Sequence, residues 1–330
     1  MPRIVRLYEF GGPEKLQLED APSQQPGKDE VKLRVQATGL NRAEAMYMRG
    51  SYYGDKPSLP SRIGFEAAGK VEAVGPGVDP VLIGRQVSTM GGFSQGQYGV
   101  LGEEAIVPVS AIAEYPGSFS PEQGASIWIA YLTAWGALIR DAGVTSGDFV
   151  VIPAASSSVG LAAIQIAKDA GAVAIATTRT AEKQQEVLAL GADHVIATEE
   201  EDLPARVREI TGGLGSRVIF DPVGGPYIEK LAEAAASSAT IFLYGGLSGQ
   251  PTVYPVATGL AKGLSLRGYT MTEVRGKQAV LDHAQSYIRE RLQDGRFVPK
   301  IAKTFPLEQS ADAYRFLESS SQVGKVVITV

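Results

Sequence analysis

The chain has 330 residues, enough for two domains of ordinary size. Its content of 44% hydrophobic and 20% charged residues is typical of a soluble globular protein, and no apolar run reaches the roughly 18 residues of a membrane span. The start of the chain lacks the apolar stretch of a signal peptide, so we expect a cytoplasmic protein that does not enter the membrane. The net charge of −5, with no basic stripe, argues against nucleic-acid binding, and the absence of cysteine excludes disulfides, thiolate nucleophiles and cysteine-bound zinc.

The first part of the chain, to about residue 120, is rich in glycine and proline and contains short alternating runs such as Glu30 to Val35. This pattern predicts an all-β domain with many turns. From about residue 123 apolar strands alternate with helices. We expect strands at 149–152, 173–177, 195–196, 217–220 and 240–243, and helices at 159–170, 180–190, 203–211 and 226–236. Such alternation predicts a parallel sheet covered on both faces.

After about residue 264 the alternation becomes looser. The pattern predicts helices near 277–294 and 308–318 and strands at 301–305 and 325–330. We expect this tail to return to the β-rich domain. The predicted organisation is therefore one domain made of residues 1–122 and 264–330, and a second domain at 123–263.

The strand at 149–152 runs into a turn and then a helix, the geometry in which helix N–H groups meet a diphosphate. The usual motif has three glycines. Here Ala155 and Ser157 occupy the first two glycine positions and Gly160 keeps the third, with Ser156, Ser158 and Val159 between them. We predict that this turn binds a dinucleotide, through its small residues and serine hydroxyls. The alternative is an ordinary strand-turn-helix with serine caps.

The end of the next strand indicates which dinucleotide is bound. A site for NAD carries an acidic residue there, which hydrogen-bonds the ribose 2′-hydroxyl. This chain has Thr178 and Arg179 instead, followed one turn later by Lys183. The two cations favour the 2′-phosphate of NADPH, although each could also be an ordinary solvated surface residue.

Six short segments carry a resemblance to a known family. They lie at residues 39–42, 64–71, 154–160, 220–225, 245–249 and 324–327. In this order and spacing they resemble the zinc-free, quinone oxidoreductase-like branch of the medium-chain dehydrogenase/reductases. The resemblance implies an α/β protein in which a GroES-like β-rich catalytic domain is interrupted by a Rossmann domain, a doubly wound parallel sheet that binds NADPH.

The chain departs from the zinc-containing members of that family. They place a cysteine in the segment matching residues 38–41 and a histidine before the glutamate of the segment matching 64–66. This chain has no cysteine, and Phe65 stands in the histidine position. A catalytic zinc needs three protein ligands, so we predict no metal site.

Three residues are candidates for the chemistry. The resemblance places Asn41 beside the nicotinamide, although Asn41 and Glu44 also form a capping-box pattern for a helix. Tyr52 matches the spacing of a tyrosine that donates a proton in related enoyl reductases; it could instead stack on a quinone or be a surface aromatic residue. Thr133 lies on a helix that, by resemblance, approaches the nicotinamide, and its alternative role is helix packing.

Further cofactor contacts are expected where another strand of the sheet ends. Tyr244, Gly245, Gly246 and Ser248 follow the strand at 240–243, at the carboxyl edge where such sheets bind ligands. Arg267 matches a family position that reaches the cofactor.

The resemblance implies hydride transfer from NADPH to a small electrophile, either a quinone or an α,β-unsaturated carbonyl compound, without a metal. Two alternatives stay open: a non-catalytic NADPH-binding sensor or structural protein, and an oxidoreductase of the alcohol dehydrogenase type. We expect the strand at 240–243 to be the last of its sheet. Relatives pair such free edges across a two-fold axis, so we expect a homodimer.

Overall fold

A computed structural model describes residues 1–54 and 56–330 of the protein. The chain divides into two compact units: unit 1 comprises Met1–Ile129 and Pro299–Val330, and unit 2 comprises Ala130–Val298. The sequence pattern places the return to the first domain at residue 264, whereas the structure places it at Pro299. In the part of the chain that the structure describes, no helix has both the length and the apolarity to cross a membrane.

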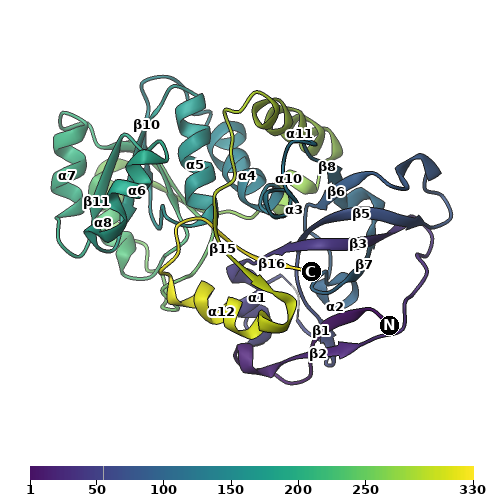
Figure 1. Ribbon diagram of the computed structural model, residues 1–330. Coiled ribbons are helices and arrows are strands. Elements are labelled where there is room, and N and C mark those ends of the chain that lie inside the picture. Colours follow the sequence, from purple (N-terminus) through teal and green to yellow (C-terminus); the bar gives the residue numbers. More distant parts are fainter. Residues whose placement is uncertain (55) are drawn as a thin grey trace. The chain divides into compact units, whose positions relative to one another are not determined.

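A seven-stranded sheet forms the centre of unit 1 (Figure 1). Its strands follow the order β15-β16-β3-β5-β6-β8, and β7 also pairs with β3. Their bounds are β3 (Glu30–Gly39), β5 (Glu66–Val74), β6 (Gln86–Thr89), β7 (Glu104–Pro108), β8 (Ile112–Glu114), β15 (Ile301–Pro306) and β16 (Lys325–Thr329). The alternating residues Val31, Leu33 and Val35 of β3 lie in a buried hydrophobic cluster, as the sequence pattern predicts. Strand β16 pairs antiparallel with β3, which confirms that the C-terminal strand returns to the β-rich domain.

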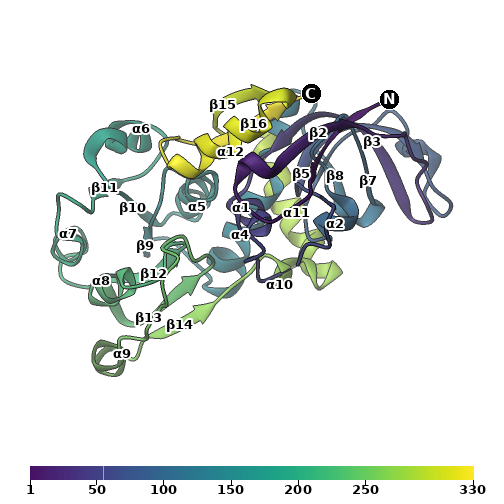
Figure 2. The same ribbon diagram turned by 90° about the horizontal axis from the view of Figure 1, so that it is seen from below.

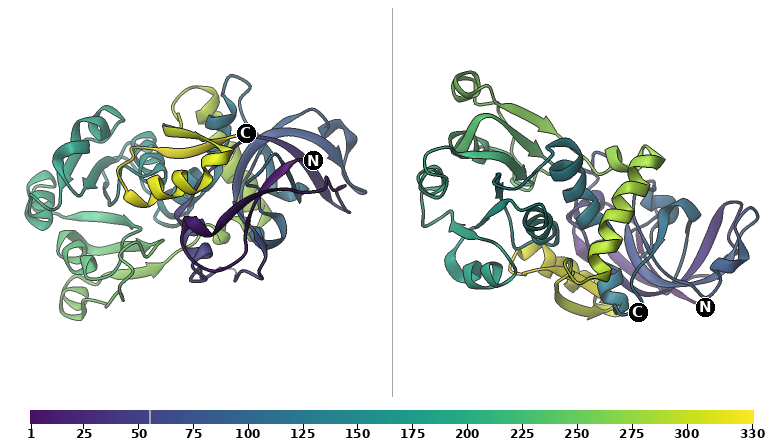
Figure 3. Two further views of the ribbon diagram at one scale, coloured as in Figure 1. Left: turned by 60° about the horizontal axis from the view of Figure 1, so that its bottom comes forward. Right: turned by 90° about the horizontal axis from the view of Figure 1, so that it is seen from above.

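Smaller elements complete unit 1. A second sheet has the strand order β2-β1-β4. Its bounds are β1 (Arg3–Leu7), β2 (Leu16–Asp20) and β4 (Ser61–Arg62), and the helices of the unit are α1 (Arg42–Met48), α2 (Gln95–Tyr98), α3 (Pro121–Gly124) and α12 (Ser310–Ser319). Figure 3 shows α12, in yellow, alongside β15 and β16, which it contacts.

Unit 2 contains a six-stranded parallel sheet with the order β11-β10-β9-β12-β13-β14. The strands are β9 (Phe149–Ile152), β10 (Val173–Thr178), β11 (His194–Ala197), β12 (Ser216–Asp221), β13 (Ala235–Leu243) and β14 (Ser265–Gly268). Counted along the chain, this is the order 3-2-1-4-5-6 of a doubly wound dinucleotide-binding fold. The predicted Rossmann architecture is thus confirmed.

Helices lie on both faces of this sheet (Figure 2). The helices between residues 128 and 293 are α4 (Trp128–Trp135), α5 (Ser158–Asp169), α6 (Gln184–Ala189), α7 (Leu203–Ile210), α8 (Tyr227–Ala234), α9 (Val256–Lys262), α10 (Thr272–Arg275) and α11 (Gln278–Gln293), with a π-helix, η4, at Gly136–Asp141 and a 3₁₀ turn, η5, at Ala181–Lys183. Helix α5 contacts β9 and β10, and α8 contacts β13. The core therefore lies between the sheet and its two helical layers.

One prediction about the sheet is wrong. The strand at 240–243 is not the last, because β14 pairs parallel with β13, Leu266 opposite Ile241. The sequence pattern misses β14 because an edge strand needs no continuous apolar run: Ser265 and Gly268 are exposed and Leu266 is only half-buried. The edge strand of the sheet is therefore β14.

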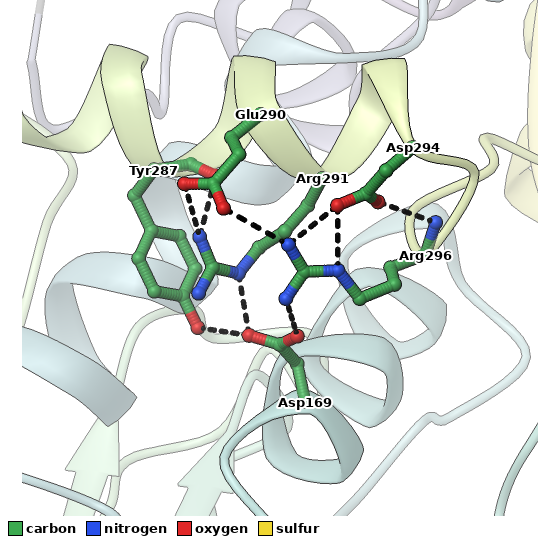
Figure 4. Close-up of polar contacts among 6 residues, drawn as sticks. All are labelled: Asp169, Tyr287, Glu290, Arg291, Asp294 and Arg296. Carbon is green, nitrogen blue, oxygen red and sulfur yellow. Dashed lines mark hydrogen bonds and ion pairs between the residues drawn. The ribbon is translucent and has the colours of Figure 1, made fainter.

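The last turn of α5 is anchored to α11 through Asp169 (Figure 4). The Asp169 carboxylate accepts hydrogen bonds from the Tyr287 hydroxyl at 2.7 Å, from Arg291 and from Arg296 at 2.6 Å. Burial alone would raise the pKa of Asp169, but these three donors hold it below its usual value. The Arg291 guanidinium also lies 3.4 Å from the centroid of the Tyr287 ring. This network anchors the C-terminal end of α5, which is the end away from the serine-rich turn.

Candidate functional site

The turn between β9 and α5 has the local geometry of a phosphate-binding turn. Ala154 adopts a left-handed conformation with φ of +48°, which reverses the chain direction after the strand. The Ala155 N–H donates to the Thr177 carbonyl at 3.1 Å, and the Ser157 N–H donates to the Ala154 carbonyl at 3.0 Å. These bonds tie the turn to β10 and direct the chain into α5.

Ser157 is the N-cap of α5. Its hydroxyl oxygen accepts the Gly160 N–H at 3.0 Å, so the capping interpretation of this serine is confirmed. The hydroxyl hydrogen of Ser157 is not used in that bond and can still be donated. Ser158, Val159 and Gly160 form the first turn of a twelve-residue helix, where N–H groups and the dipole favour an anion. Capping and phosphate binding are therefore compatible at this turn.

Gly160 is required by close packing. A Cβ atom at this position would lie 2.7 Å from both the Cα and the carbonyl oxygen of Ala155 and 2.8 Å from the Ala154 carbonyl oxygen. All three are backbone atoms of the turn, so they cannot move aside without changing its shape. The third glycine of the motif is kept because α5 must approach the turn closely.

We therefore expect Gly160→Ala to destabilise the protein by about 1–3 kcal/mol and to distort the turn. Gly117→Ala is the matched control, because no atom lies within 4 Å of a Cβ built at Gly117. Melting temperatures of the two variants and of the unaltered protein would be compared. An unchanged melting temperature for Gly160→Ala would contradict the packing argument.

The residues that follow β10 lie on the same side of the sheet as this turn. The Thr178 hydroxyl donates to the Thr180 carbonyl at 2.9 Å and so shapes the loop. Arg179 is exposed and forms no ion pair with any residue that the structure describes. The Lys183 ammonium lies 3.5 Å from the Ser156 hydroxyl, and burial together with the positive charge of Arg179 lowers the pKa of Lys183. The structure thus brings two cations and a serine of the turn together.

The loop after β13 also meets this edge of the sheet. The Tyr244 ring stacks on Phe220, with the two centroids 4.0 Å apart. Burial and the nearby Asp221 carboxylate raise the pKa of Tyr244 well above its usual value, so the phenol is neutral. A Cβ at Gly245 would lie 2.8 Å from the Pro222 carbonyl oxygen, so this glycine also permits a close approach.

The rest of that loop is more open. Gly246 has no atom within 4 Å of a built Cβ. The Ser248 hydroxyl oxygen accepts the Gln250 N–H at 3.2 Å. A side chain at Gly246 would therefore meet open space, and Ser248 shapes the loop as well as being a candidate donor.

Arg267 has carboxylate partners within unit 2. Its guanidinium pairs with Asp141 and, at 2.6 Å, with Glu273. It also lies over the rings of Phe242 and Tyr269, 5.4 and 5.9 Å from their centroids. The charge of Arg267 is thus already matched, and these contacts hold β14 to η4 and α10.

In unit 1, Asn41 is the N-cap of α1, and its capping box with Glu44 is present. The Asn41 N–H donates to Glu44 at 3.0 Å, and the Asn41 side-chain amide donates to the Gly39 carbonyl at 3.2 Å. The Asn41 side-chain oxygen accepts a hydrogen bond from the Lys325 ammonium at 2.7 Å. Both ends of the amide are therefore held, and its orientation is fixed.

Lys325 and Glu66 form a buried ion pair that the sequence analysis does not find. They lie 2.6 Å apart, with side chains only 1% and 0% exposed. The other Glu66 oxygen accepts the Ile129 N–H at 3.1 Å, near the start of α4. The available signal is a lysine that begins the apolar run of the terminal strand, because a buried lysine in a strand requires a partner.

Glu44 is the second buried carboxylate of this region. It accepts the Phe65 N–H at 3.1 Å and the Tyr314 hydroxyl at 2.8 Å. Burial raises the pKa of Glu44, and that shift is partly opposed by the hydrogen bond from the Asn41 N–H, by the positive charge of Lys325 and by the hydrogen bonds from Tyr314 and Phe65. Through Glu44 the structure links α1, α12 and the segment that carries Phe65.

Tyr52 belongs to a row of aromatic rings in unit 1. Its centroid lies 4.8 Å from that of Tyr53 and 5.9 Å from that of Phe65, and Phe65 lies 6.1 Å from Phe93. Tyr52 is half-buried and packs against the core of the unit, whereas Tyr53 is exposed. Glu44 thus joins Asn41 to Phe65, and the Phe65 ring in turn contacts Tyr52.

Thr133 lies in α4 of unit 2, and its side chain is buried. Among the described residues, no three histidine, aspartate or glutamate side chains are grouped as a metal ion would need. Apart from Thr133, the candidate residues fall into two groups, one around Asn41 and Tyr52 in unit 1 and one at the carboxyl edge of the sheet in unit 2.

Comparison with known proteins now identifies the family. Residues 27–120 match the alcohol dehydrogenase GroES-like domain, and residues 158–286 match the zinc-binding dehydrogenase domain. The chain is 31% identical over 328 residues to the quinone oxidoreductase of Homo sapiens, covering 99% of this chain and 97% of that protein. The chain belongs to the quinone oxidoreductase family. The motifs at residues 39–42 and 154–160 thus indicate the family correctly.

Other members of this oxidoreductase family extend the likeness. A 2-haloacrylate reductase of Burkholderia sp is 28% identical over 334 residues, with 98% of this chain and 97% of that protein covered. The crystal structure of Escherichia coli quinone oxidoreductase complexed with NADPH has a TM-score of 0.91 and 29% identity, covering 99% of this chain and 100% of that one. The GroES-like and Rossmann domains predicted from the sequence are thereby confirmed.

Proposed function

We propose that the protein is an NADPH-dependent reductase that transfers hydride to a quinone or an α,β-unsaturated carbonyl compound without a metal. The observation that carries this proposal is the serine-capped turn at α5, with Lys183 3.5 Å from Ser156 and Arg179 beside it. A turn of that shape suits a diphosphate, and the two cations suit a further phosphate. Relatives named as quinone oxidoreductases and a haloacrylate reductase support the reaction class.

The residues present fit NADPH. The α5 N-terminus together with Ser156 and Ser157 would hold the diphosphate, at a turn whose shape depends on the close packing of Gly160. Arg179 and Lys183 would hold the 2′-phosphate. The loop containing Tyr244, Gly245, Gly246 and Ser248, with Thr133 and Thr178, would line the rest of the cofactor. Arg267, already paired with two carboxylates, would act by positioning β14.

When bound, the reduced nicotinamide supplies a hydride. The acceptor gains that hydride and one proton, so that the two-electron reduction balances. Asn41 and Tyr52 would line the acceptor side, with the Asn41 amide orientation set by Lys325 and Glu44. Tyr52 would deliver the proton from its hydroxyl to the anion that forms. Phe65, at the position where zinc-containing relatives have a histidine, supplies a ring beside Tyr52 and no ligand atom.

The direct test follows the absorbance of NADPH on mixing with quinones, short enals and enoyl thioesters. We expect cofactor consumption with at least one of these acceptors, and faster consumption with NADPH than with NADH. NADPH binding without turnover on any acceptor would favour the sensor alternative. Reduction of NADP⁺ by simple alcohols, with no reductase activity, would favour the alcohol dehydrogenase alternative.

Tyr52→Phe separates proton donation from stacking. If the hydroxyl donates the proton, we expect kcat to fall by about 100-fold, because general acid catalysis contributes about 10²–10⁴-fold. The phenylalanine ring keeps the contacts with Phe65, so substrate stacking is preserved. Tyr53→Phe, on the exposed neighbouring ring, should leave kcat unchanged. An unchanged kcat for Tyr52→Phe would refute the acid role and leave stacking.

We also propose a homodimer formed through the edge of the unit 2 sheet. The edge strand β14 has no further strand beyond it in the described chain, and the neighbouring helix α9 exposes Val256 and Leu260. An open edge beside apolar side chains favours pairing with a second copy. Light scattering in solution should give twice the chain mass, and a monomer mass would contradict this assembly. The cytoplasmic location stays a prediction from the sequence.

A further inference from the structure

Asn41 is the only asparagine in the chain, and neighbours within unit 1 hold both ends of its amide. The oxygen, Oδ1, accepts a hydrogen bond from the Lys325 ammonium at 2.7 Å, and the nitrogen, Nδ2, donates to the Gly39 carbonyl at 3.2 Å. An ammonium can only donate, so the amide end that faces Lys325 must be the oxygen. The nitrogen of Asn41 therefore faces away from Lys325.

The second hydrogen of the Asn41 nitrogen is weakly held. Its partner is Glu44 Oε1 at 3.4 Å, which is longer than usual for an N–H donor and an oxygen. That oxygen already accepts the Phe65 N–H at the shorter distance of 3.1 Å. Asn41 is half-buried, whereas the Lys325 and Glu66 side chains are 1% and 0% exposed. Among these residues only Asn41 is partly exposed, and its nitrogen has a hydrogen to offer.

Strand pairing places Lys325 beside Asn41. Strand β16 runs antiparallel to β3, with Val327 opposite Gly39. Continued by two residues, this register brings Lys325 to Asn41. A Cβ at Gly39 would lie 2.7 Å from Lys325 Cε, so the glycine leaves room for the lysine side chain. The sheet itself therefore fixes the contact between the ammonium and the amide.

The Glu66 carboxylate, 2.6 Å from the Lys325 ammonium, compensates the buried charge. A buried ion pair, however, is often no more stabilising than apolar side chains of similar volume. Stability alone therefore does not explain a lysine at the start of β16, whose next three residues are buried and apolar. The contact with Asn41 gives a reason, because a positive charge on an amide oxygen makes the amide N–H a stronger donor.

We propose that Asn41 donates its second N–H to the carbonyl oxygen of the acceptor, and that Lys325 is a positioning residue whose charge strengthens this donor. The inference rests on the proposed reductase function. When hydride adds to one alkene carbon of a conjugated carbonyl compound, the alkene electron pair shifts and the carbonyl becomes an enolate with a negative oxygen. A proton then adds to the other alkene carbon and restores the carbonyl. A donor directed at that oxygen stabilises the transition state.

The single asparagine allows a direct spectroscopic test. Asparagine labelled with ¹⁵N introduces one labelled side chain and one labelled backbone N–H, both of Asn41. Replacing the ion pair by uncharged residues, Glu66→Gln with Lys325→Met, should move the side-chain resonances in the nuclear magnetic resonance spectrum. The backbone N–H, bound to Glu44 at 3.0 Å, should move much less. Side-chain resonances that stay in place would overturn the role of Lys325.

Kinetics separate positioning from stability. With cyclohex-2-enone and NADPH, we expect kcat of the double variant to fall about 10-fold and KM to change less than about threefold, because the bond strengthens as charge develops on the oxygen. Glu66→Gln alone keeps the lysine charge but should be the less stable of the two variants. The less stable variant should therefore have the higher kcat. A purely structural role of Lys325 would give the opposite order, with activity following stability.

A second comparison tests whether Lys325 acts through Asn41. Asn41→Leu removes the donor and keeps the approximate size of the side chain, and should lower kcat by about 100-fold. Adding Glu66→Gln with Lys325→Met to Asn41→Leu should then cause no further loss, because coupled residues are not additive. A further loss as large as that seen with Asn41 present would overturn the proposal.

The matched control is another lysine–glutamate pair of unit 1. Lys32, on β3, lies 3.0 Å from Glu72, and its side chain is only 10% exposed. Its other polar contact is with Ser23, at 3.4 Å, so it does not bind Asn41. Lys32→Met with Glu72→Gln should change neither kcat nor the Asn41 side-chain resonances. Equal effects of the two double variants would show a general effect of lost ion pairs and overturn the proposal.

The outcome is separable from that of the reductase proposal. Cyclohex-2-enone added to the labelled protein loaded with NADP⁺ cannot react, because the oxidised cofactor has no hydride to give. It should nevertheless move the Asn41 side-chain resonances, and no movement would overturn the donor role. If the unaltered protein reduces no acceptor, the proposed function fails, and this titration still decides whether Asn41 binds the carbonyl oxygen.

Discussion

Replacing both Arg179 and Lys183 with alanine is expected to weaken NADPH binding by at least about 100-fold and to leave NADH binding unchanged. Each cation would lose a charge-assisted contact with the 2′-phosphate, worth about 1.5–3 kcal/mol, and about 1.4 kcal/mol corresponds to a factor of ten. NADH has no such phosphate, so its affinity reports only the rest of the site. Fluorescence titration of both cofactors measures the ratio directly.

The control for this pair is Lys230→Gln, which removes an exposed cation from α8. It should change neither affinity, which would exclude a general effect of net charge. The lowered pKa of Lys183 adds a second expectation: a phosphate bound beside it would favour the charged form, so NADPH binding should take up protons and weaken as the pH rises through that pKa. Equal weakening of NADPH and NADH in the double variant would contradict the assignment.

Glu66→Gln is expected to destabilise the protein by about 3–5 kcal/mol. The substitution keeps the shape of the side chain but removes the carboxylate that pairs directly with the Lys325 ammonium, which is 1% exposed. Breaking one side of a buried ion pair is far more harmful than removing both charges, because an uncompensated buried charge remains. The midpoint of urea unfolding, compared with that of the unaltered protein, gives the magnitude.

Two further variants serve as controls for this prediction. Glu308→Gln removes one of the two carboxylate partners of Arg3, at an ion pair where the glutamate is 54% exposed, and should leave the urea midpoint nearly unchanged. Adding Lys325→Met to Glu66→Gln removes both charges and should recover part of the stability. If Glu66→Gln unfolds at the same urea concentration as the unaltered protein, then the ion pair contributes less to the free energy of unfolding than its burial indicates.

The fold could be predicted from the sequence where the pattern is local and repeated. The alternating residues of β3 and the apolar strands that follow residue 149 indicate their structures directly. Prediction fails where burial is partial: the polar edge strand β14 was missed, and the predicted helix at 226–236 runs into β13, which begins at Ala235. An alanine-rich stretch has no clear period, so the boundary there is set by pairing with β12.

In the candidate site, too, contacts between near neighbours in the chain could be predicted and contacts between distant residues could not. The turn at 154–160 could be predicted because every residue that shapes it is a near neighbour in the chain. Lys325 and Glu66 are 259 positions apart, and Arg291 and Asp169 are 122 positions apart. Such partners are chosen by the tertiary fold, and no spacing rule in one sequence joins them.

The return of the C-terminal strand to unit 1 has a consequence for biosynthesis. Residues 130–298 are all made before β16, so the six-stranded sheet can form while the chain is still on the ribosome. The seven-stranded sheet cannot, because β3 must wait for a neighbour translated almost 300 residues later. Until then Glu66 has no cation. A nascent chain would therefore carry a finished second unit and an unfinished first one, and the interval between the two is when chaperones would be needed most.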